Sequence, residues 1–548
     1  MFRYNALMAT AFILTVSAAA QPAISSYQPI ANSASYLSPG MSASGIAQGS
    51  VFAVFGSGFG PSGSYTTAAT YPLQTTLGGV SVKVTVSGTS VNAIMLGVFY
   101  GYQINALLPS STPVGSGTFT VSFAGHTSAQ APIQVVATAF GLYAANWQAD
   151  GQASATNASG NPNSIINTFH PGDTVTLWGT GLGPVSWDET QLPSAGDLSS
   201  SLPVATQVYI GNTTVAAGYH GRAGCCSGVD QVVFTIPSGV QGCYVPVAVQ
   251  AGGVTSNIVT IAVSNSGSTC SDSPMGQNLV NKLAAGGPVN FGYIRLEAGS
   301  YNSYDGGYAT FNQFTPATAT LASYAPSVGY CMAVDCSVRC QTNGNESLTD
   351  LTEPIYNGLD AGSGIGVQGE AGNAVIQQQY LGLYGNYNLG NGSRFLFASP
   401  PPFTVSDITG GLNVGPFSAS VSVSGSASAF SNIPRYETVP RNSDLTVKWN
   451  TGSFKNPGGL ATIAGYSESE GFQNIALFQC TANASDGQFT IPAWLLTWLP
   501  VTGLNGNANG TGALLLGQYD PPVQFNATGL DLGLITDITF YWVGVSFK

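Results

Sequence analysis

Acidic residues spaced two or three positions apart are the first candidates for chemistry in this chain. Glu468 and Glu470 stand in the run SESE, and Asp350 and Glu353 stand in the run DLTE. Glycoside hydrolysis uses two carboxylates, one as general acid and one as base or nucleophile. On a β-strand Glu468 and Glu470 would share a face, since side chains alternate with period two. Solvated loop acids are nevertheless the favoured interpretation, so we predict no catalytic residue here.

The eight cysteines form two local groups of four: Cys225, Cys226, Cys243 and Cys270, then Cys331, Cys336, Cys340 and Cys480. The spacing Cys-x4-Cys-x3-Cys in the second group could hold a metal or an iron–sulfur cluster. No histidine lies nearby to complete a zinc site, and exported chains favour disulfides. We therefore expect disulfides and no bound metal. Each group allows three pairings, and the sequence does not choose among them.

Histidine-based catalysis has little support. The histidines His126, His170 and His220 do not occupy matching positions in the two repeats described below, and no Gly-x-Ser-x-Gly or His-Glu-x-x-His motif occurs. Asp150 and the run 157–164 could bind Ca²⁺ through carboxylate, amide and carbonyl oxygens. The same residue types are typical of turns, which is the interpretation we favour. The sequence therefore predicts neither a catalytic set nor a cofactor.

A glycine-rich turn follows an apolar strand at two places in the chain. The runs GSVFAVFGSGFGP (49–61) and GDTVTLWGTGLGP (172–184) both end in Gly-x-Gly-x-Gly-Pro. A dinucleotide-binding turn needs a helix directly after it, whose first amides hold the pyrophosphate. Pro61 and Pro184 are followed by residues with no helical pattern. We therefore predict that both turns are structural.

The glycine turn is one part of a longer duplication. QINALLP at 103–109 corresponds to QVVFTIP at 231–237, and a further strand pattern follows each of them. Each copy is large enough to bury its own core. Short runs of alternating β-branched and aromatic residues, separated by turns, predict an antiparallel sandwich in each copy.

The rest of the chain has no second copy. A polar linker at 265–288 includes a predicted helical turn around Leu279 to Leu283, and IPAWLLTWLP at 491–500 is the best short helix beyond it. LPVTG at 499–503 matches a sortase signal, but apparent strands follow it, so a chance match is favoured. We predict an all-β fold with a lead, two tandem immunoglobulin-like sandwiches and a larger β-rich C-terminal region, over 21–47, 48–137, 138–264 and 289–548.

Composition and charge narrow the class of protein. Only 7% of the residues are charged, against roughly 25% in a typical soluble protein, and the net charge is −12. This balance predicts no nucleic-acid partner. Arg3, the apolar stretch 6–16 and three alanines ending at Ala20 predict a signal peptide over 1–20, cleaved after Ala20. No long apolar run follows, so we expect a secreted or cell-surface protein without an integral membrane segment.

The strand-GSGFGP and strand-GTGLGP segments resemble the opening of TIG/IPT-type immunoglobulin-like domains. With LGGVSVKV, YQINALLP, AGCCSGVDQVVFTIP and GCYVPVAVQAGGVTSN, the pattern is similar to a family of uncharacterised secreted bacterial proteins named for Solibacter. The resemblance covers about 30–264. It implies an immunoglobulin-like fold and secretion, and no reaction. In that family such segments usually end larger chains, whereas here they precede the C-terminal region.

Aromatic residues remain as candidates for binding, because 26 Phe, 25 Tyr and 7 Trp exceed what two modest sandwich cores need. Exposed Tyr and Trp can stack on sugar rings, and YLGLYGNYN at 380–388 has suitable spacing. The hypothesis that follows is a non-catalytic extracellular or cell-surface protein whose modules serve as a scaffold for adhesion, binding or assembly. Its partner would be a glycan or another surface protein. The alternative is a secreted polysaccharide-acting enzyme with its catalytic site in 289–548.

Overall fold

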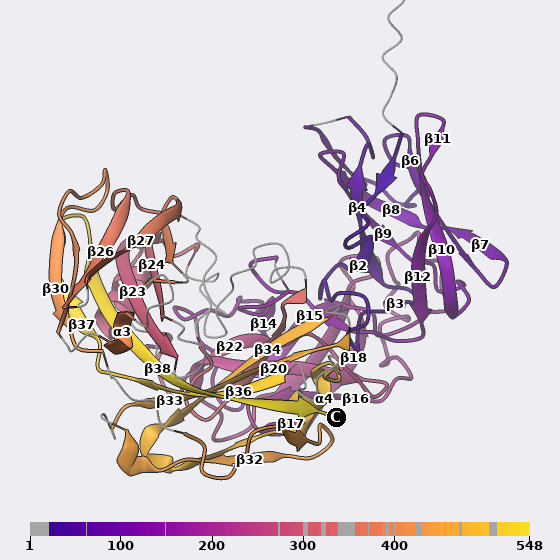
Figure 1. Ribbon diagram of the computed structural model, residues 1–548. Helices are drawn as coiled ribbons and strands as arrows, with labels where there is room; N and C mark the ends of the chain where they lie inside the picture. The colour runs from indigo at the N-terminus through magenta and orange to yellow at the C-terminus, as the bar shows by residue number, and fades with distance from the viewer. Residues whose placement is uncertain are drawn as a thin grey trace, which may run out of the picture.

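The computed structural model is almost entirely β-sheet (Figure 1). Two immunoglobulin-like sandwiches, called module 1 and module 2 below, precede a larger β-rich C-terminal region, which confirms the predicted fold class. The predicted signal peptide, Cys340, Asp350 and Glu353 lie outside the described residues. The structure describes residues 21–548 apart from 62, 148, 272–274, 300–304, 319–324, 338–356, 371, 387, 390–394, 399–401, 424–428, 455, 457, 471–473 and 504–511.

Module 1 consists of two six-stranded sheets around an apolar core. One sheet has the order β1-β4-β9-β8-β5 with β2 beside β4, and the other has the order β3-β12-β10-β6-β7 with β11 beside β10. Every second residue of β6 is buried, because side chains alternate along a strand. The strands are β1 (Ala23–Ile24), β2 (Ile30–Asn32), β3 (Ile46–Ala47), β4 (Val51–Ser57), β5 (Tyr65–Thr67), β6 (Val80–Val86), β7 (Thr89–Asn92), β8 (Ile94–Phe99), β9 (Gln103–Leu107), β10 (Gly115–Phe123), β11 (His126–Thr127) and β12 (Ala131–Val136).

Module 2 has the same design with two five-stranded sheets. One has the order β13-β15-β19-β18 with β14 beside β15, and the other has the order β17-β16-β20-β21 with β22 beside β20. Its own apolar core lies between them. The strands are β13 (Gly141–Leu142), β14 (Ala155–Asn157), β15 (Thr174–Thr180), β16 (Thr206–Ile210), β17 (Thr213–Ala216), β18 (Tyr219–Arg222), β19 (Asp230–Thr235), β20 (Gly242–Ala251), β21 (Val254–Thr255) and β22 (Val259–Val263).

The two modules repeat one strand pairing around the glycine turn. Phe55 of β4 pairs with Gln103 of β9, and Trp178 of β15 pairs with Gln231 of β19. β1 and β2 lie against β4 as β13 and β14 lie against β15. Residues 21–47, which we expected to form a lead, therefore supply three strands of the first sandwich. These strands are two or three residues long, too short to show a hydrophobic period.

The first glycine of each turn is required because two strands approach closely there. A Cβ atom on Gly56 would clash with the carbonyl oxygen of Ala23, and one on Gly179 would clash with that of Gly141. Gly181 has a φ of 107°, which favours glycine. The described residues after each turn contain no helix before the next strand. The repeated motif is thus explained by the backbone geometry of the fold.

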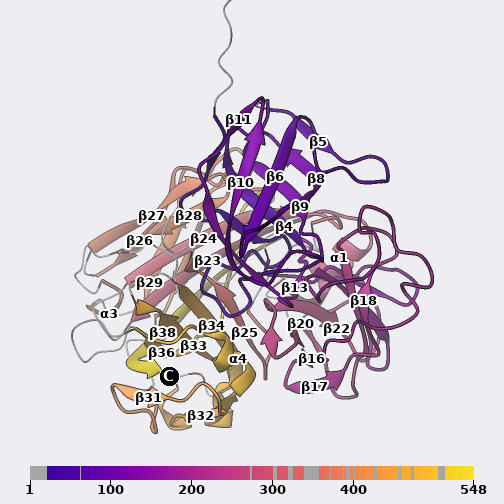
Figure 2. The same cartoon turned by 90° about the vertical axis from the view of Figure 1, so that its right-hand side faces the viewer.

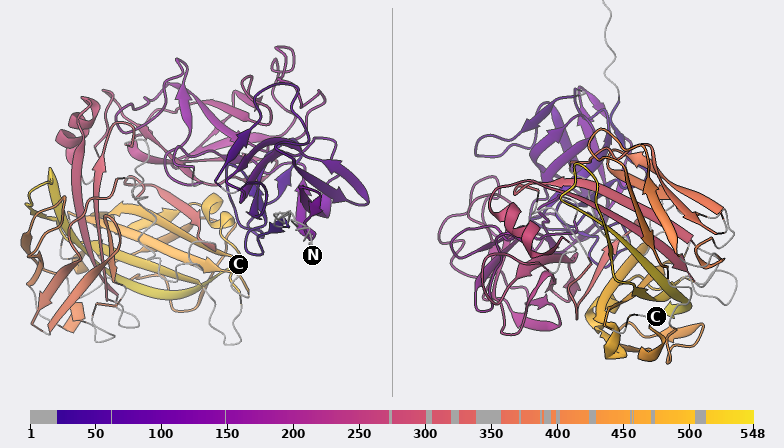
Figure 3. Two further views of the ribbon diagram at one scale, coloured as in Figure 1. Left: turned by 90° about the horizontal axis from the view of Figure 1, so that it is seen from above. Right: turned by 90° about the vertical axis from the view of Figure 1, so that its left-hand side faces the viewer.

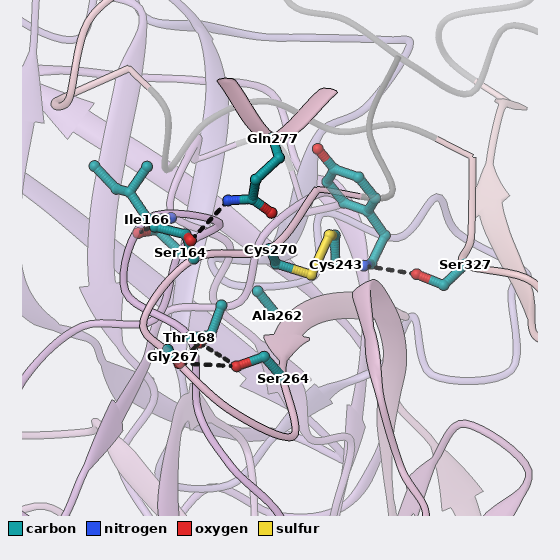
Figure 4. Close-up of a disulfide and its surroundings, with 12 residues drawn as sticks. Ser164, Ile166, Thr168, Cys243, Ala262, Ser264, Gly267, Cys270, Gln277 and Ser327 are labelled. Carbon is teal, nitrogen blue, oxygen red and sulfur yellow. Dashed lines mark hydrogen bonds between the residues drawn. A yellow bond between two sulfur atoms is a disulfide. The ribbon is translucent and has the colours of Figure 1, made fainter. Parts of the chain in front are cut away.

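The linker is tied to module 2 by a disulfide (Figure 4). Cys243 of β20 is bonded to Cys270, which lies ahead of helix α1 (Gly276–Ala284). The amide of Tyr244 donates to Ser327 Oγ at 3.0 Å, so the same strand also contacts the C-terminal region. The predicted helical turn is therefore part of a nine-residue helix, and this helix packs against a buried apolar cluster.

The C-terminal region is built on a fourteen-stranded sheet of order β25-β34-β33-β36-β38-β23-β24-β28-β27-β26-β29-β30, with β31 and β37 paired to β38. β38 joins the two halves, since it pairs with β23 and β37 toward one end and with β36 and β31 toward the other. Two short strands, β32 and β35, form a separate sheet. The bounds are β23 (Val289–Gly299), β24 (Asp305–Phe314), β25 (Cys331–Asp335), β26 (Gly364–Gly369), β27 (Gly372–Tyr380), β28 (Leu383–Asn386), β29 (Phe403–Asp407), β30 (Phe417–Val421), β31 (Glu437–Val439), β32 (Leu445–Lys448), β33 (Leu460–Glu468), β34 (Ile475–Asn483), β35 (Gln488–Ile491), β36 (Gly512–Tyr519), β37 (Val523–Phe525), β38 (Leu532–Phe547), α3 (Phe395–Ala398), α4 (Ala493–Trp498), η1 (Thr451–Ser453) and η3 (Ala484–Asp486).

One half of this sheet packs against module 2 and the other extends away from it (Figures 1 and 3). The core around β33, β34 and β36 includes Tyr209 and Ile258 of module 2 and Leu37 of the 21–47 segment. Trp494 of α4 stacks on Tyr209 with ring centroids 5.0 Å apart. Module 1 stands at the top of Figure 2, above module 2 and the C-terminal region. The three parts of the chain are therefore joined by shared packing.

Candidate functional site

A cleft opens where module 1, module 2 and the C-terminal region meet. Its volume is about 400 Å³, and each of the three parts supplies part of its wall. We call it the three-way cleft. Its lining is aromatic, amide-bearing and acidic: Gln28, Ser35, Tyr36, Leu37, Ser38, Phe55, Gln103, Trp147, Ala149, Asp150, Asn257, Ile258, Ala333, Val334, Asp335 and Trp498. A concave site with aromatic faces and a few polar groups is the usual form of a ligand pocket.

Trp147 is the most exposed large side chain of the cleft, at 77%. Its φ is 62° and that of Ala149 is 68°, a region that side chains rarely adopt and that costs of order 1–3 kcal/mol per residue. The buried amide of Asn257 holds the segment in place, since Nδ2 donates to the carbonyl oxygens of Leu142 and Ala149 at 2.9 and 2.6 Å. The exposed indole ring is therefore carried by a strained backbone that hydrogen bonds hold in place.

A second wall of the cleft comes from the 21–47 segment. Tyr36 has a φ of 47°, and its carbonyl oxygen accepts a hydrogen bond from Gln28 Nε2 at 2.9 Å. Its ring packs against Phe55 with centroids 6.1 Å apart. Burial raises the pKa of Tyr36, and a hydrogen bond with Gln103 acts in the opposite direction. The phenol is therefore neutral at physiological pH and keeps its hydrogen-bonding capacity.

The charges in the cleft are all negative. Asp150 and Asp335 line it, and none of its described lining residues is Lys, Arg or His. Asp335 accepts hydrogen bonds from the amides of Ser38 at 2.6 Å and Ser337 at 2.9 Å, which ties the C-terminal region to the 21–47 segment. Carboxylates repel an anionic ligand but accept hydrogen bonds from hydroxyl groups. The lining therefore suits a neutral ligand rich in hydroxyls.

Glu468 and Glu470 lie outside this cleft. β33 ends at Glu468, so the strand geometry that would place both acids on one face does not extend to Glu470. Burial raises the pKa of Glu468 to about 7. Nearby Tyr466 packs on Trp542 with ring centroids 5.2 Å apart, and its pKa is raised to about 12 by burial and by the charge of Glu468.

The proposed calcium-binding residues are separated. Asp150 lines the three-way cleft, whereas Asn157 closes a local turn by accepting hydrogen bonds from the amides of Ser159 and Asn161, both at 3.0 Å. Within the described part of the chain, no group of three or more His, Cys, Asp and Glu side chains could hold a metal ion. At the other end of the run, the buried side chain of Asn163 is hydrogen-bonded to the backbone of Ala262 in β22.

The LPVTG run is folded into the C-terminal region. Thr502 is 1% exposed, its Oγ1 accepts a hydrogen bond from the amide of Phe547 at 2.8 Å, and its carbonyl oxygen accepts one from Lys548 Nζ at 2.7 Å. The side chain of Thr502 is therefore part of the packed fold, whereas that of Val501 beside it is 47% exposed. In the described residues no helix is long and apolar enough to cross a membrane.

The disulfides whose two cysteines the structure describes stay within the two cysteine groups. The three pairs that the structure describes are Cys225–Cys226, Cys243–Cys270 and Cys331–Cys480. Cys336 is disulfide-bonded as well. The histidines are dispersed over β11, β18 and the loop before β15, where His170 Nε2 lies 2.8 Å from the carbonyl oxygen of Gly267.

A buried ionic cluster at the joint between the modules was not predicted from the sequence. Arg222 forms an ion pair with Asp230 and donates to the carbonyl oxygens of Gly183 at 2.8 Å and of Gly49 in module 1 at 2.7 Å. Both charged side chains are almost fully buried. The signal that could have revealed it is an acidic residue directly before Gln231, where the first copy has Tyr102.

The same cluster occupies the amides of the second glycine turn. Asp230 accepts hydrogen bonds from the amides of Gly181 at 2.7 Å and Leu182 at 2.8 Å, so these donors are not available to a phosphate. Burial raises the pKa of Asp230, while Arg222 and the two amides act in the opposite direction. Glu189 adds a second contact between the modules, accepting from the amide of Ser110 at 2.6 Å.

No protein-family model and no curated protein matches this chain. Among solved structures, the chain is 10% identical to a Ca²⁺-stabilised adhesin of an Antarctic bacterium that binds ice, covering 91% of this chain and 94% of that one, with a TM-score of 0.12. It is 11% identical to the mixed-linkage glucan protein SGBP-B of Bacteroides ovatus (77% and 85% covered, TM-score 0.15) and 16% identical to domains 5–6 of the S-layer protein SbsC (45% and 100% covered, TM-score 0.15). Scores this low carry no argument about function.

Proposed function

We propose that this is an exported, non-catalytic binding protein that holds a neutral polysaccharide in the three-way cleft. The observation that carries the proposal is Trp147, an indole exposed at 77% and held at a strained φ on the wall of an acidic, amide-bearing cleft. An aromatic face packs against the C–H face of a sugar ring, and carboxylates and amides receive its hydroxyls. The modules would then be of the TIG/IPT-like type, serving as the frame of the site.

Rigidity of the frame supports this proposal. The cleft is lined by three parts of the chain, and each junction is fixed by buried or half-buried contacts: Arg222 across the modules, Asp335 to Ser38, and Trp498 Nε1 to the carbonyl oxygen of Ser256 at 3.0 Å. A site that is formed before binding loses less entropy when the ligand enters. The disulfides support export, since they persist in oxidising compartments, and we propose cleavage of 1–20 after Ala20.

The test is retardation of the purified protein in native gels that contain soluble neutral polysaccharides, with polygalacturonate as an anionic control. We expect Trp147→Ala to weaken binding about tenfold, equivalent to the loss of about 1.4 kcal/mol of ring contact. Tyr436→Ala is the matched control, because Tyr436 is 52% exposed, also has a positive φ, and lies outside the cleft directly before β31. Unchanged retardation of Trp147→Ala on every polysaccharide that retains the wild type would refute the proposal.

A second candidate function is polysaccharide hydrolysis in the C-terminal region. It is favoured by Glu468, because a carboxyl group with a pKa of about 7 is suited to act as a general acid at neutral pH. The same polysaccharides separate the two functions. Release of reducing ends that Glu468→Gln abolishes would favour the enzyme, and retention without release would favour the binding protein.

A further inference from the structure

Module 1 carries a cluster of three exposed tyrosines at the end that points away from module 2. Tyr65, Tyr100 and Tyr102 are exposed by 67%, 47% and 54%. Tyr100 and Tyr102 are stacked, with ring centroids 5.7 Å apart and planes 17° apart, and Tyr65 lies 6.5 Å from Tyr100. Tyr65 begins β5, and the other two form the turn from β8 to β9. We call this cluster the tyrosine end.

The duplication shows that the corresponding end of module 2 is an interface. Gly179 of the second glycine turn pairs with Asp230, and at the equivalent place Gly56 donates its amide to the carbonyl oxygen of Tyr102 at 2.9 Å. In module 2 this end is covered by module 1, because Arg222, which is ion-paired to Asp230, donates to the carbonyl oxygen of Gly49. Tyr102 therefore stands where the other copy carries the acid that is paired to its interface arginine.

The turn that carries the rings is held in a strained conformation. Tyr100 has a φ of 54°, and its amide donates to the carbonyl oxygen of Ser64 at 2.6 Å. The carbonyl oxygen of the next residue, Gly101, accepts from the amide of Phe59 at 3.0 Å. These bonds join the tyrosine turn to the glycine turn on one side and to β5 on the other. A non-glycine residue at positive φ persists only when its surroundings impose it, which is typical of ligand-contacting positions.

The chemistry of the tyrosine end selects the type of ligand. The segments that carry the three rings, 63–67 and 97–102, contain no acidic or basic residue. They offer phenol rings and hydroxyls, together with serine and threonine side chains. A charged ligand finds no complementary charge there, whereas sugar rings can pack on the phenol faces and bond to the hydroxyls.

We propose that the tyrosine end is a second binding site for a neutral polysaccharide, independent of the three-way cleft. Tyr65, Tyr100 and Tyr102 form its platform, and the ligand lies across the exposed ring faces. A polymer bound at both sites is held far more tightly than at either one, because the second contact becomes intramolecular. This inference goes beyond the proposed function and does not require the cleft to bind.

Affinity electrophoresis on the full chain tests the inference, with hydroxyethyl cellulose, arabinoxylan and galactomannan as neutral probes and polygalacturonate as the anionic one. On a neutral probe that retains the wild type, we expect Tyr102→Ala to weaken binding at least fivefold, alone and combined with Trp147→Ala. Tyr102→Phe should retain most of the binding, because the ring remains. Tyr102→Asp, which introduces the residue of module 2, should abolish the contribution of this site. Tyr436→Ala is again the control, and unchanged thermal midpoints exclude misfolding.

The outcomes separate the two sites. Loss of binding in the Tyr102 variants with normal binding by Trp147→Ala supports the tyrosine end and refutes the cleft. The reverse pattern refutes the tyrosine end and leaves the cleft standing. If no neutral probe retains the wild type, both proposals fail. If Tyr102→Ala instead converts a dimer into a monomer in sedimentation, with retention unchanged, this end is a contact between copies of the chain and the inference is wrong.

Discussion

At the residue scale, both candidate sites contain aromatic side chains at positive φ, a conformation that Tyr436, at 65°, also adopts outside them. Tyr36 and Trp147 lie in the three-way cleft and Tyr100 lies at the tyrosine end, and all three have φ between 47° and 62°. Bulky residues rarely adopt this conformation, so each instance needs a cause. Here each strained backbone is held by hydrogen bonds from neighbouring residues, and in each case the fold fixes where a ring is presented.

The stability of the folded chain should depend on pH through Glu468, whose pKa rises from 4.5 to about 7 on folding because the group is partly buried. The folded state therefore binds more protons than the unfolded state between these values, and stability falls as pH rises through 7. We expect Glu468→Gln to match the wild type at pH 4 and to exceed it above pH 7.5 by on the order of 1 kcal/mol, after allowance for solvent screening. Urea unfolding at several pH values measures the difference.

Glu437→Gln is the control for this measurement, because Glu437 is an exposed acid on β31. A pH-dependent difference of the same size in Glu437→Gln would show that the effect is not particular to Glu468. A Glu468→Gln difference that is flat from pH 4 to 8 would contradict the assigned pKa.

At the scale of elements, the glycine turn has a different role in each of the two copies. In both, the first glycine lets a neighbouring strand approach. In module 2 the turn also becomes the joint with module 1, because Asp230 binds its amides and Arg222 reaches across to Gly49. In module 1 the equivalent position is Tyr102, whose side chain is exposed to solvent. One duplicated element thus provides both an internal joint and an exposed surface.

Removal of Arg222 should test that joint. Arg222→Ala leaves Asp230 buried without its cation, and we expect a loss of about 3–5 kcal/mol in the free energy of unfolding. The double variant Arg222→Ala with Asp230→Asn should lose less than the sum of the single variants, since Asn keeps an acceptor for the turn amides without a charge. Denaturant unfolding measures all three, and strict additivity would show that the two side chains do not act together.

At the scale of the whole molecule, the C-terminal region is not an independent body. Its core includes Tyr209, Ala248 and Ile258 of module 2, and Leu37 and Met41 of the 21–47 segment. Removing the modules would expose these contact surfaces to water at about 25 cal/mol per Å². The cleft exists only because all three parts are present.

The isolated 289–548 fragment should therefore be less stable than the same residues in the full chain. We expect a lower urea midpoint and binding of a dye that reports exposed apolar surface, because the faces that meet Tyr209 and Leu37 lose their cover. The comparison is with the full chain from 21 to 548 under the same conditions. Coincident unfolding midpoints would show that the region folds alone.

Local pattern was sufficient for much of the fold. The alternating strands and the glycine turns are visible in the sequence because they depend on neighbours within a few residues. Two features of the fold were not visible: the membership of 21–47 in module 1 and the end of β33 at Glu468. The strands within 21–47 are too short to show a hydrophobic period, and the residue at which β33 ends depends on what packs beyond the strand.

The sequence alone indicates that the protein is all-β, that two sandwiches repeat one design, and that aromatic residues exceed the needs of their cores. The positions of those aromatic side chains depend on the tertiary structure. Trp147, Tyr36 and Asp335 are far apart in the chain and meet because three separate parts pack together. Tyr102 and Asp230 occupy one position of the repeat, and only the packing of module 1 on module 2 buries one and exposes the other. Such contacts join residues more than a hundred positions apart, and no local pattern encodes them.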